Sequence, residues 1–299
     1  MDDMSGAANT FDRTVEDLGN VVELGHVNVR VPDQRLATLF YVSGLGLTRD
    51  PYLMTGVDNM WINVGRSQFH LPMGQPQVVR GVTGLVVSDR EALLRRLAAV
   101  KRHLEGTRFA FSETEEAIET TCPWGNRIRV HAPDPQRFGP ITLGMPYVEF
   151  GVSPGRLEGV VRFYQQILSG TAGLAEDAGG RYAYAMVGPQ NRLIFREFTG
   201  EIGDYDGHHV QISLVDFSGP HRRLLERGLI TEESDQHQYR FEKIVDPEDG
   251  SLIFTVEHEV RSMQHPMYAR PLVNRNPAIT NRNYKPGHEA WAWSFGLDS

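Results

Sequence analysis

The sequence lacks several features that would place it in large protein classes. Its 299 residues include a single cysteine, Cys122, which excludes an internal disulfide framework and suits a reducing cytoplasm. No apolar run approaches the roughly 20 residues that a membrane-spanning helix needs. The N-terminus also lacks the charged-then-apolar pattern of a secretion signal. We therefore expect a cytoplasmic protein with no membrane partner.

Basic residues are scarce relative to acidic ones. The 30 Lys and Arg against 38 Asp and Glu give a formal net charge of −8, and the basic residues form no block. Phosphate-backbone binding relies on clustered Lys and Arg, so we expect no nucleic-acid partner. Hydrophobic and charged contents of 40% and 23% are ordinary for a globular protein, for which we expect a small-molecule substrate. Self-association into a homo-oligomer stays open.

One pattern, a strand followed by a helix and then short strands, occurs four times between about residues 20 and 260. Alternation at period two predicts the strands, and apolar spacing of three to four predicts the helices. The four opening strands are expected at 24–31, 81–87, 146–152 and 206–216, and the helices at 34–42, 91–100, 157–168 and 221–227. This recurrence of strands and helices predicts an α+β protein built from four similar units.

Changes in composition suggest a division of the chain. Residues 1–20 are polar and acidic and are expected to form a flexible arm. Residues 21–135 and 141–260 would form two domains of two units each, joined by a Pro- and Gly-containing linker. Residues 261–299, rich in Pro, Asn and Arg, would form a C-terminal extension.

Two histidines stand at similar places in the first and fourth units. His26 follows Gly25 in the first predicted strand, and His209 follows Gly207-His208 in the fourth unit. Imidazoles on rigid strands can begin a metal site if the fold brings those strands together. A histidine at a strand end can also be simply hydrogen-bonded or solvated.

Openings of the type Gly-His-Val-x-Val at 25–29 and closings of the type Pro-x-Gly-Asn-x-Ile at 123–128 resemble the vicinal oxygen chelate superfamily. That group includes glyoxalase I, bleomycin-resistance proteins and extradiol dioxygenases. The resemblance spans residues 22–260. It implies four βαβββ modules forming two paired cup-shaped sheets, followed by the C-terminal extension. It also implies metal ligands on the first and last strands of paired units.

The resemblance leaves the pairing of the units to be decided by their residues. Pairing units three and four would put Tyr147 where a histidine is usual, and pairing units one and two would face His26 and His70 with Val82. Pairing units one and four collects His26, His70 and His209, with a carboxylate available at Glu257. We therefore favour this third pairing.

Such a set resembles the two-histidine, one-carboxylate centre of non-haem Fe(II) oxygenases. It predicts an Fe(II) extradiol-like dioxygenase that cleaves a small dihydroxylated aromatic or similar bidentate substrate, with His26, His209 and Glu257 on the metal and His70 nearby. Mn(II), Ni(II) and Zn(II) suit the same ligands. Strand alternation puts Glu257 on the opposite face from Phe254, the usual ligand position, so residues 257–259 all stay candidates.

Proton transfer in such a reaction needs further groups. His208, His237 and Tyr239 are the candidate catalytic residues, because a histidine near neutrality can shuttle a proton. Two other functions stay open. One is a glyoxalase-like lyase or isomerase. The other is a metal-free small-molecule binding or resistance protein, which Val82, Tyr147 and Phe254 at would-be ligand positions favour.

Overall fold

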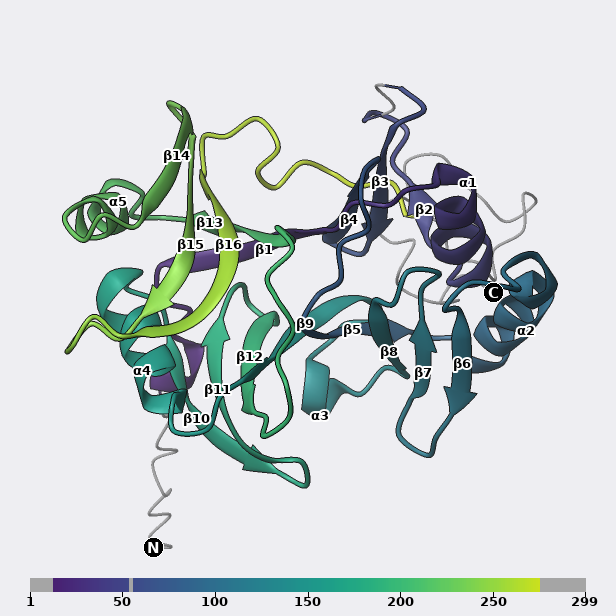
Figure 1. Ribbon diagram of the computed structural model, residues 1–299, viewed down its shortest axis with the longest axis horizontal. Coiled ribbons are helices and arrows are strands. Elements are labelled where there is room, and N and C mark those ends of the chain that lie inside the picture. Colours follow the sequence, from purple (N-terminus) through teal and green to yellow (C-terminus); the bar gives the residue numbers. More distant parts are fainter. Residues whose placement is uncertain (1–12, 54–55, 275–299) are drawn as a thin grey trace, which may run out of the picture.

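A computed structural model describes residues 13–53 and 56–274, and these form two mixed eight-stranded sheets with few helices (Figure 1). The first unit contains β1 (Val21–Asn28), α1 (Gln34–Ala37) continued by the π-helix η2 (Thr38–Gly44), β2 (Thr48–Arg49), β3 (Asn59–Val64) and β4 (Ser67–Pro72). The second contains β5 (Gly81–Val87), α2 (Arg90–Val100), η3 (Lys101–His103), β6 (Ala110–Glu113), β7 (Ile118–Thr121) and β8 (Arg127–His131).

The short helix α3 (Pro135–Phe138) joins the two halves of the chain. The third unit contains β9 (Leu143–Val152), α4 (Leu157–Arg162) continued by the π-helix η4 (Phe163–Ile167), β10 (Ala172–Asp177), β11 (Gly180–Met186) and β12 (Arg192–Glu197). The fourth contains β13 (His209–Leu214), α5 (Ser218–Leu225), β14 (Ile230–Asp235), β15 (Gln238–Val245) and β16 (Leu252–Ser262).

The sheets combine the units in a nested order. The first sheet runs β14-β15-β16-β13-β1-β4-β3-β2 and so joins units one and four. The second runs β10-β11-β12-β9-β5-β8-β7-β6 and joins units two and three. The α+β class and the paired sheets expected from the sequence are confirmed. Each sheet takes one unit from either side of the expected division at 135–141, so that division does not coincide with the sheets.

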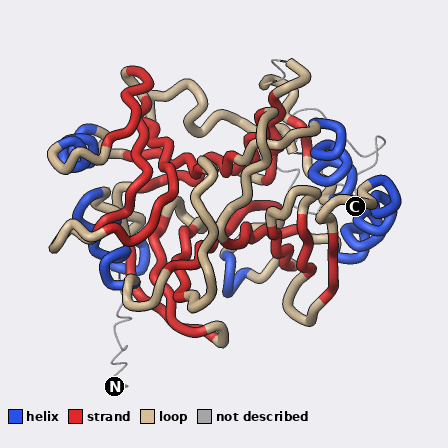
Figure 2. Tube along the Cα trace, in the orientation of Figure 1, coloured by secondary structure: helices blue, strands red, loops and turns tan. Residues whose placement is uncertain are grey.

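Local sequence explains the helices. Asp33 begins α1 by accepting hydrogen bonds from the backbone N–H groups of Arg35 and Leu36, and Asp89 caps α2 through the N–H of Ala92. The helices of the four units lie at the two ends of the molecule, with the strands and the short helix α3 between them (Figures 1 and 2). In the described part of the chain no helix is long and apolar enough to cross a membrane.

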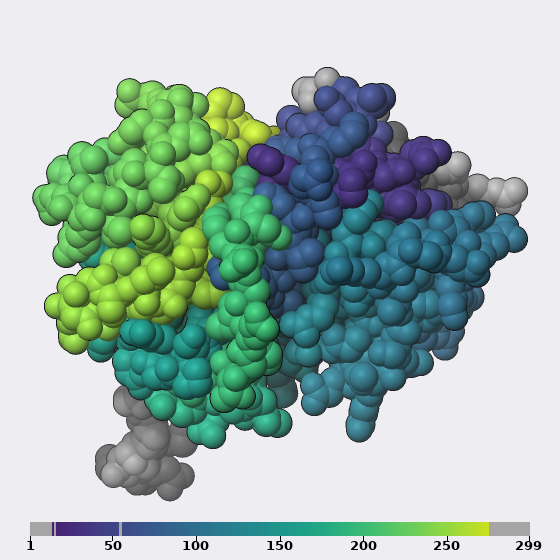
Figure 3. Space-filling view, in the orientation of Figure 1, coloured from purple at the N-terminus to yellow at the C-terminus, as the bar shows by residue number. Residues whose placement is uncertain are grey.

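The chain outside the two sheets is anchored at both ends of the described region. Residues Arg13–Glu16 form a 3-10 helix, Gly19 bridges to Gly170, and Asn20 is buried. The rest of the expected arm, residues 1–12, lies outside the described residues, as does 275–299 of the extension. The segment linking β12 to β13 crosses the front of the molecule as the green band in Figure 3, where Asp206 binds the backbone N–H of Val78.

Candidate metal centre

The strand register of the first sheet puts four potential ligands on one face. In the antiparallel pair β1–β13, His26 is opposite Gln211 and Asn28 is opposite His209. In the parallel pairs, His70 of β4 is beside Asn28 and Glu259 of β16 is beside Gln211. Residues that pair across neighbouring strands share a face, as do residues two apart on one strand. His26, His70, His209 and Glu259 therefore all project from the same side.

Three of these side chains meet. Each of His26, His70 and His209 offers a ring nitrogen, and the three nitrogens lie within 4.8 Å of one another. Nε2 of His26 is 3.3 Å from Nε2 of His209. His26 and His209 are buried, and His70 is partly buried. The expectation that units one and four bring these histidines together is therefore met by the geometry of the sheet.

Neighbouring side chains on β3 hold His70 in place. Its ring stacks on Trp61, with ring centroids 3.8 Å apart, and its Nε2 is 2.9 Å from Oδ1 of Asn59. Trp61 also meets the edge of His26 at 5.0 Å. A hydrogen bond from Nε2–H to the Asn59 oxygen leaves the lone pair of His70 on Nδ1.

Two carboxylates lie beside His209 but in different roles. Glu257 Oε1 is 3.1 Å from Nδ1 of His209, whereas Glu259 Oε2 is 3.5 Å from Nε2, the nitrogen that faces His26. An acceptor on Nδ1 orients the ring, which is how carboxylates outside a metal's ligand set support a ligating histidine. Glu259 lies on the Nε2 side of the ring, the side that faces His26.

Two arginines balance these carboxylates. Arg240 Nη1 is 2.6 Å from Glu257 and its Nη2 is 2.7 Å from Glu259, while Arg261 Nη2 is 2.6 Å from Glu259. Burial alone would raise the pKa of Glu259, but its hydrogen bond to His209 and the charge of Arg261 outweigh it, so the pKa lies below its ordinary range. Glu259 is an ionised, buried carboxylate.

The histidines differ in protonation. Burial lowers the pKa of His26 well below its ordinary value, and burial together with His209 lowers that of His70 to about 3. Burial also disfavours charge on His209, but its hydrogen bonds to Glu257 and Glu259 raise its pKa overall. Neutral imidazoles and an ionised carboxylate are the donors that Fe(II), Mn(II), Ni(II) and Zn(II) accept, so a metal would displace the proton that the carboxylates favour on His209. The residues present therefore fit a divalent metal.

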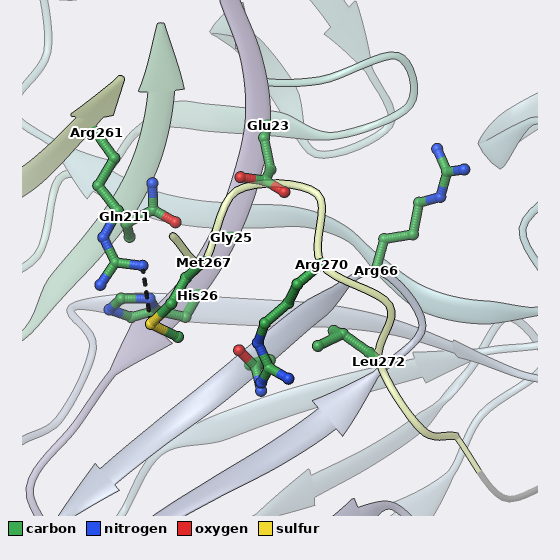
Figure 4. Close-up of a pocket in the computed structure, with 10 residues that line it drawn as sticks. Glu23, Gly25, His26, Arg66, Gln211, Arg261, Met267, Arg270 and Leu272 are labelled. Atoms are coloured by element: carbon green, nitrogen blue, oxygen red, sulfur yellow. Dashed lines mark hydrogen bonds between the residues drawn. The ribbon is translucent and has the colours of Figure 1, made fainter. Parts of the chain in front are cut away.

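The C-terminal extension covers this face. After β16 the chain runs across the first sheet towards β2 and β3 (Figure 1), where Asn63 binds the carbonyl of Val273. Met267, Arg270 and Leu272 line a small cavity together with His26, and Arg261 contacts Met267 at 3.6 Å (Figure 4). Arg270 pairs with Asp50, whose side chain is fully buried, at 2.5 Å. We call residues 263–274 the strap.

The candidate catalytic residues lie elsewhere. His208 precedes His209 on the chain and so faces the other side of the sheet, where it is buried with Nδ1 2.7 Å from Asp206. Tyr239 also faces the core, packed against Phe217 and His221. His237 lies in the β14–β15 turn, where its backbone N–H binds Asp235. None of these three belongs to the histidine cluster.

Sequence reasoning missed most of the groups that surround the histidines. Arg240 and Arg261 neutralise the two carboxylates, and Trp61 and Asn59 hold His70. Asn59, Trp61 and Arg261 lie on strands next to those that carry the histidines, Arg240 lies one strand further out on β15, and all four alternate onto the same face. The sequence signal for them is this alternation, which becomes usable only once the strand order is known.

Solved structures show what the fold is similar to. The chain resembles glyoxalase I from Zea mays at 14% identity, covering 80% of this chain and 92% of that one with a TM-score of 0.52. It resembles equally a protein from Bacillus subtilis, assigned provisionally as a dioxygenase, at 14% identity, with 81% and 86% covered and a TM-score of 0.51. No protein-family model and no curated protein matches the sequence. With its two eight-stranded sheets of paired βαβββ units, the chain has the vicinal oxygen chelate fold.

Proposed function

We propose that the protein is a metal-dependent enzyme of the vicinal oxygen chelate type, an Fe(II) dioxygenase that cleaves a small dihydroxylated aromatic or similar bidentate substrate. The observation that carries the proposal is the meeting of His26 and His209 Nε2 atoms, 3.3 Å apart, beside the ionised Glu259. These three residues are the ligands we assign, with Glu257 orienting His209 from the other ring nitrogen.

The number of ligands decides the chemistry. A two-histidine, one-carboxylate set leaves three octahedral positions, enough for two substrate oxygens and dioxygen. His70 is stacked on Trp61 and hydrogen-bonded to Asn59, which supports treating it as a wall of the site and not as a ligand.

The chain's own residues supply the rest of the site. Arg240 and Arg261 keep Glu259 ionised and fix its position, since Arg240 donates a hydrogen bond to one of its oxygens and Arg261 forms an ion pair with the other. The strap closes the face above His26 and limits the entry of water. A bidentate substrate would enter as an anion, because two arginines already balance the two carboxylates and a divalent ion adds positive charge.

Oxygen consumption tests the proposal. Protein loaded anaerobically with Fe(II) should consume dioxygen when catechol or hydroquinone is added, and should lose the absorbance of the aromatic ring. His209→Ala should abolish both signals. His221→Ala, which removes a histidine paired with Glu233 outside the cluster, should retain them. Ring cleavage at the wild-type rate by His209→Ala would refute the assignment.

The position of His70 close to the other two histidines favours a second candidate function. If its Nδ1 is a fourth ligand, only two positions remain, which suffice for a bidentate substrate but not for dioxygen as well. Lyase or isomerase chemistry through an enediolate would then follow. Metal-dependent turnover of a hemithioacetal without oxygen uptake would identify this function, and oxygen uptake with a catechol would exclude it.

A further inference from the structure

The second sheet repeats the geometry of the first with different residues. Its register pairs Gly84 with Tyr147 and Val82 with Glu149, and places Arg129 beside Gly84 and Ile194 beside Glu149. The positions of His26, His70, His209 and Glu259 are therefore taken by Val82, Arg129, Tyr147 and Ile194. None of these four is an ordinary metal ligand, so this face has no equivalent of the histidine cluster.

An apolar plug fills the place where the histidines meet in the other sheet. Helix α3 inserts Phe138 into a buried cluster with Val82, Val86 and Tyr147, against which Ile141 and Ile194 pack. Tyr147 has its hydroxyl 2.9 Å from Nε2 of the buried His131. The face is thus closed at its centre but open towards its outer strands.

Beyond the plug lies a cavity of about 780 Å³. It runs between the β6–β7 and β10–β11 hairpins, with α3 between them in the view of Figure 1. This volume is within the roughly 300–1,000 Å³ typical of small-molecule sites. The cavity has no contact with the histidine cluster, so it can bind a ligand independently of the first sheet.

One wall of this cavity carries an excess negative charge. Arg196 is held by Asp177 through two contacts of 2.8 and 2.9 Å and by Glu149 at 3.3 Å, so one guanidinium faces two carboxylates. Glu149 and Arg196 are each about one-fifth exposed, which shields their charges from solvent. Tyr182 lies with its ring centroid 4.7 Å from the same guanidinium. This wall suits an ammonium group.

The other wall carries one guanidinium without an ion-pair partner among the described residues. Arg129 pairs with Glu119 at 2.5 Å and so is neutralised. Arg137 of α3 lies over the Phe138 ring at 5.0 Å and has no ion-pair partner among the described residues. Glu115 and Glu116 also border the cavity at the β6–β7 hairpin, and both are exposed, as Arg137 is. A free guanidinium suits a carboxylate.

We propose that this cavity is a second binding site, separate from the metal centre, for a small zwitterion that carries an ammonium and a carboxylate group, of the amino-acid type. The carboxylate binds Arg137, and the ammonium binds between Glu149 and Asp177. The site performs no chemistry, because the groups at its centre are apolar or already paired.

Calorimetric titration with three matched probes tests the proposal. L-phenylalanine carries both charges, its methyl ester keeps only the ammonium, and 3-phenylpropionate keeps only the carboxylate. Titrations of the full chain in EDTA should show L-phenylalanine binding at least about tenfold more tightly than either analogue, since each lost charged hydrogen bond costs roughly that factor. Equal affinities, tighter binding of either analogue, or no binding at millimolar concentration would overturn the proposal.

Two variants separate recognition from folding. In Arg137→Met, L-phenylalanine should bind no better than its methyl ester. In Glu149→Gln it should bind no better than 3-phenylpropionate. Arg95→Met, which removes an exposed arginine of α2 paired with Glu91, should bind like the wild type. An unchanged preference in both variants would overturn the proposal. EDTA keeps metal away from the protein throughout. Neither result therefore bears on the proposed function of the metal centre.

Discussion

His70 and Glu259 occupy equivalent positions in the two halves of the first sheet. Each lies on the last strand of its unit, beside the residue two places after a first-strand histidine: Asn28 for His70, and Gln211 for Glu259. The antiparallel pairing of His26 with Gln211 and of His209 with Asn28 relates the halves by an approximate two-fold axis. This symmetry distinguishes Glu259 from Glu257, which lies beside His209 itself.

Glu259 and Glu257 should therefore differ when each is replaced by glutamine. Glu259→Gln removes an anionic ligand and should weaken metal binding by more than about 100-fold, whereas Glu257→Gln disturbs only the orientation of His209 and should cost about 10- to 100-fold. Metal-competition titration with a chromophoric chelator measures both. Thermal unfolding of the metal-free variants controls for damage to the fold, and a larger loss in Glu257→Gln would reverse the assignment.

The histidines should not contribute equally. His26→Ala and His209→Ala should each abolish stoichiometric Fe(II) binding, because each removes one of three assigned ligands. His70→Ala should retain the metal with an affinity reduced by no more than about tenfold, since His70 is held by Trp61 and Asn59. Metal content after gel filtration gives the result. Complete loss of metal in His70→Ala would make it a ligand and favour the lyase or isomerase.

The strap should control access to His26. Arg270→Met removes the ion pair with Asp50 and should lower the free energy of unfolding by about 1–3 kcal/mol, because a buried carboxylate loses a charged partner. The freed strap should also let metal associate faster, which stopped-flow mixing can follow. Arg66→Met is the matched control, since Arg66 lines the same cavity without an ion pair in the described part of the chain. Equal association rates in both variants would contradict a covering role.

His131 should make the protein less stable in acid. Burial, and then the nearby charge of Arg137, lower its pKa to about 4, below the 6.5 expected in the unfolded chain. The unfolded state therefore binds more protons between these values, so stability is fully present above about pH 6.5 and falls as the pH drops towards 4, by at most about 3 kcal/mol. Denaturant unfolding at several pH values should show a smaller fall for His131→Gln than for wild type. His103→Gln, at an exposed position, should show the full fall.

Much of the fold could be predicted from the sequence because its inner strands alternate clearly. The segments expected at 81–87 and 146–152 agree closely with β5 and β9. The strands that went unnoticed, β2, β10 and β14, lie at the outer edges of the sheets. Ile230–Asp235 is mostly polar, because an edge strand that is exposed to solvent on both faces has no alternation of apolar residues.

The pairing of the units could be predicted from His26, His70 and His209. The details of the site could not be predicted from the sequence. Choosing between Glu257 and Glu259 needs the register of β16 against β13, which is set by packing across the sheet and by turns far along the chain. His208 was a reasonable candidate from its neighbour His209, yet one step along a strand turns its ring to the opposite face.

Anomalous scattering from crystals loaded with Fe(II) tests the central claim most directly. The account predicts one strong peak in the first sheet, about 2.2 Å from Nε2 of His26, Nε2 of His209 and a carboxylate oxygen of Glu259, with no peak on the face of the second sheet that holds Phe138. A peak at any other group of residues, or no peak after loading with Fe(II), Mn(II), Ni(II) or Zn(II), would contradict it.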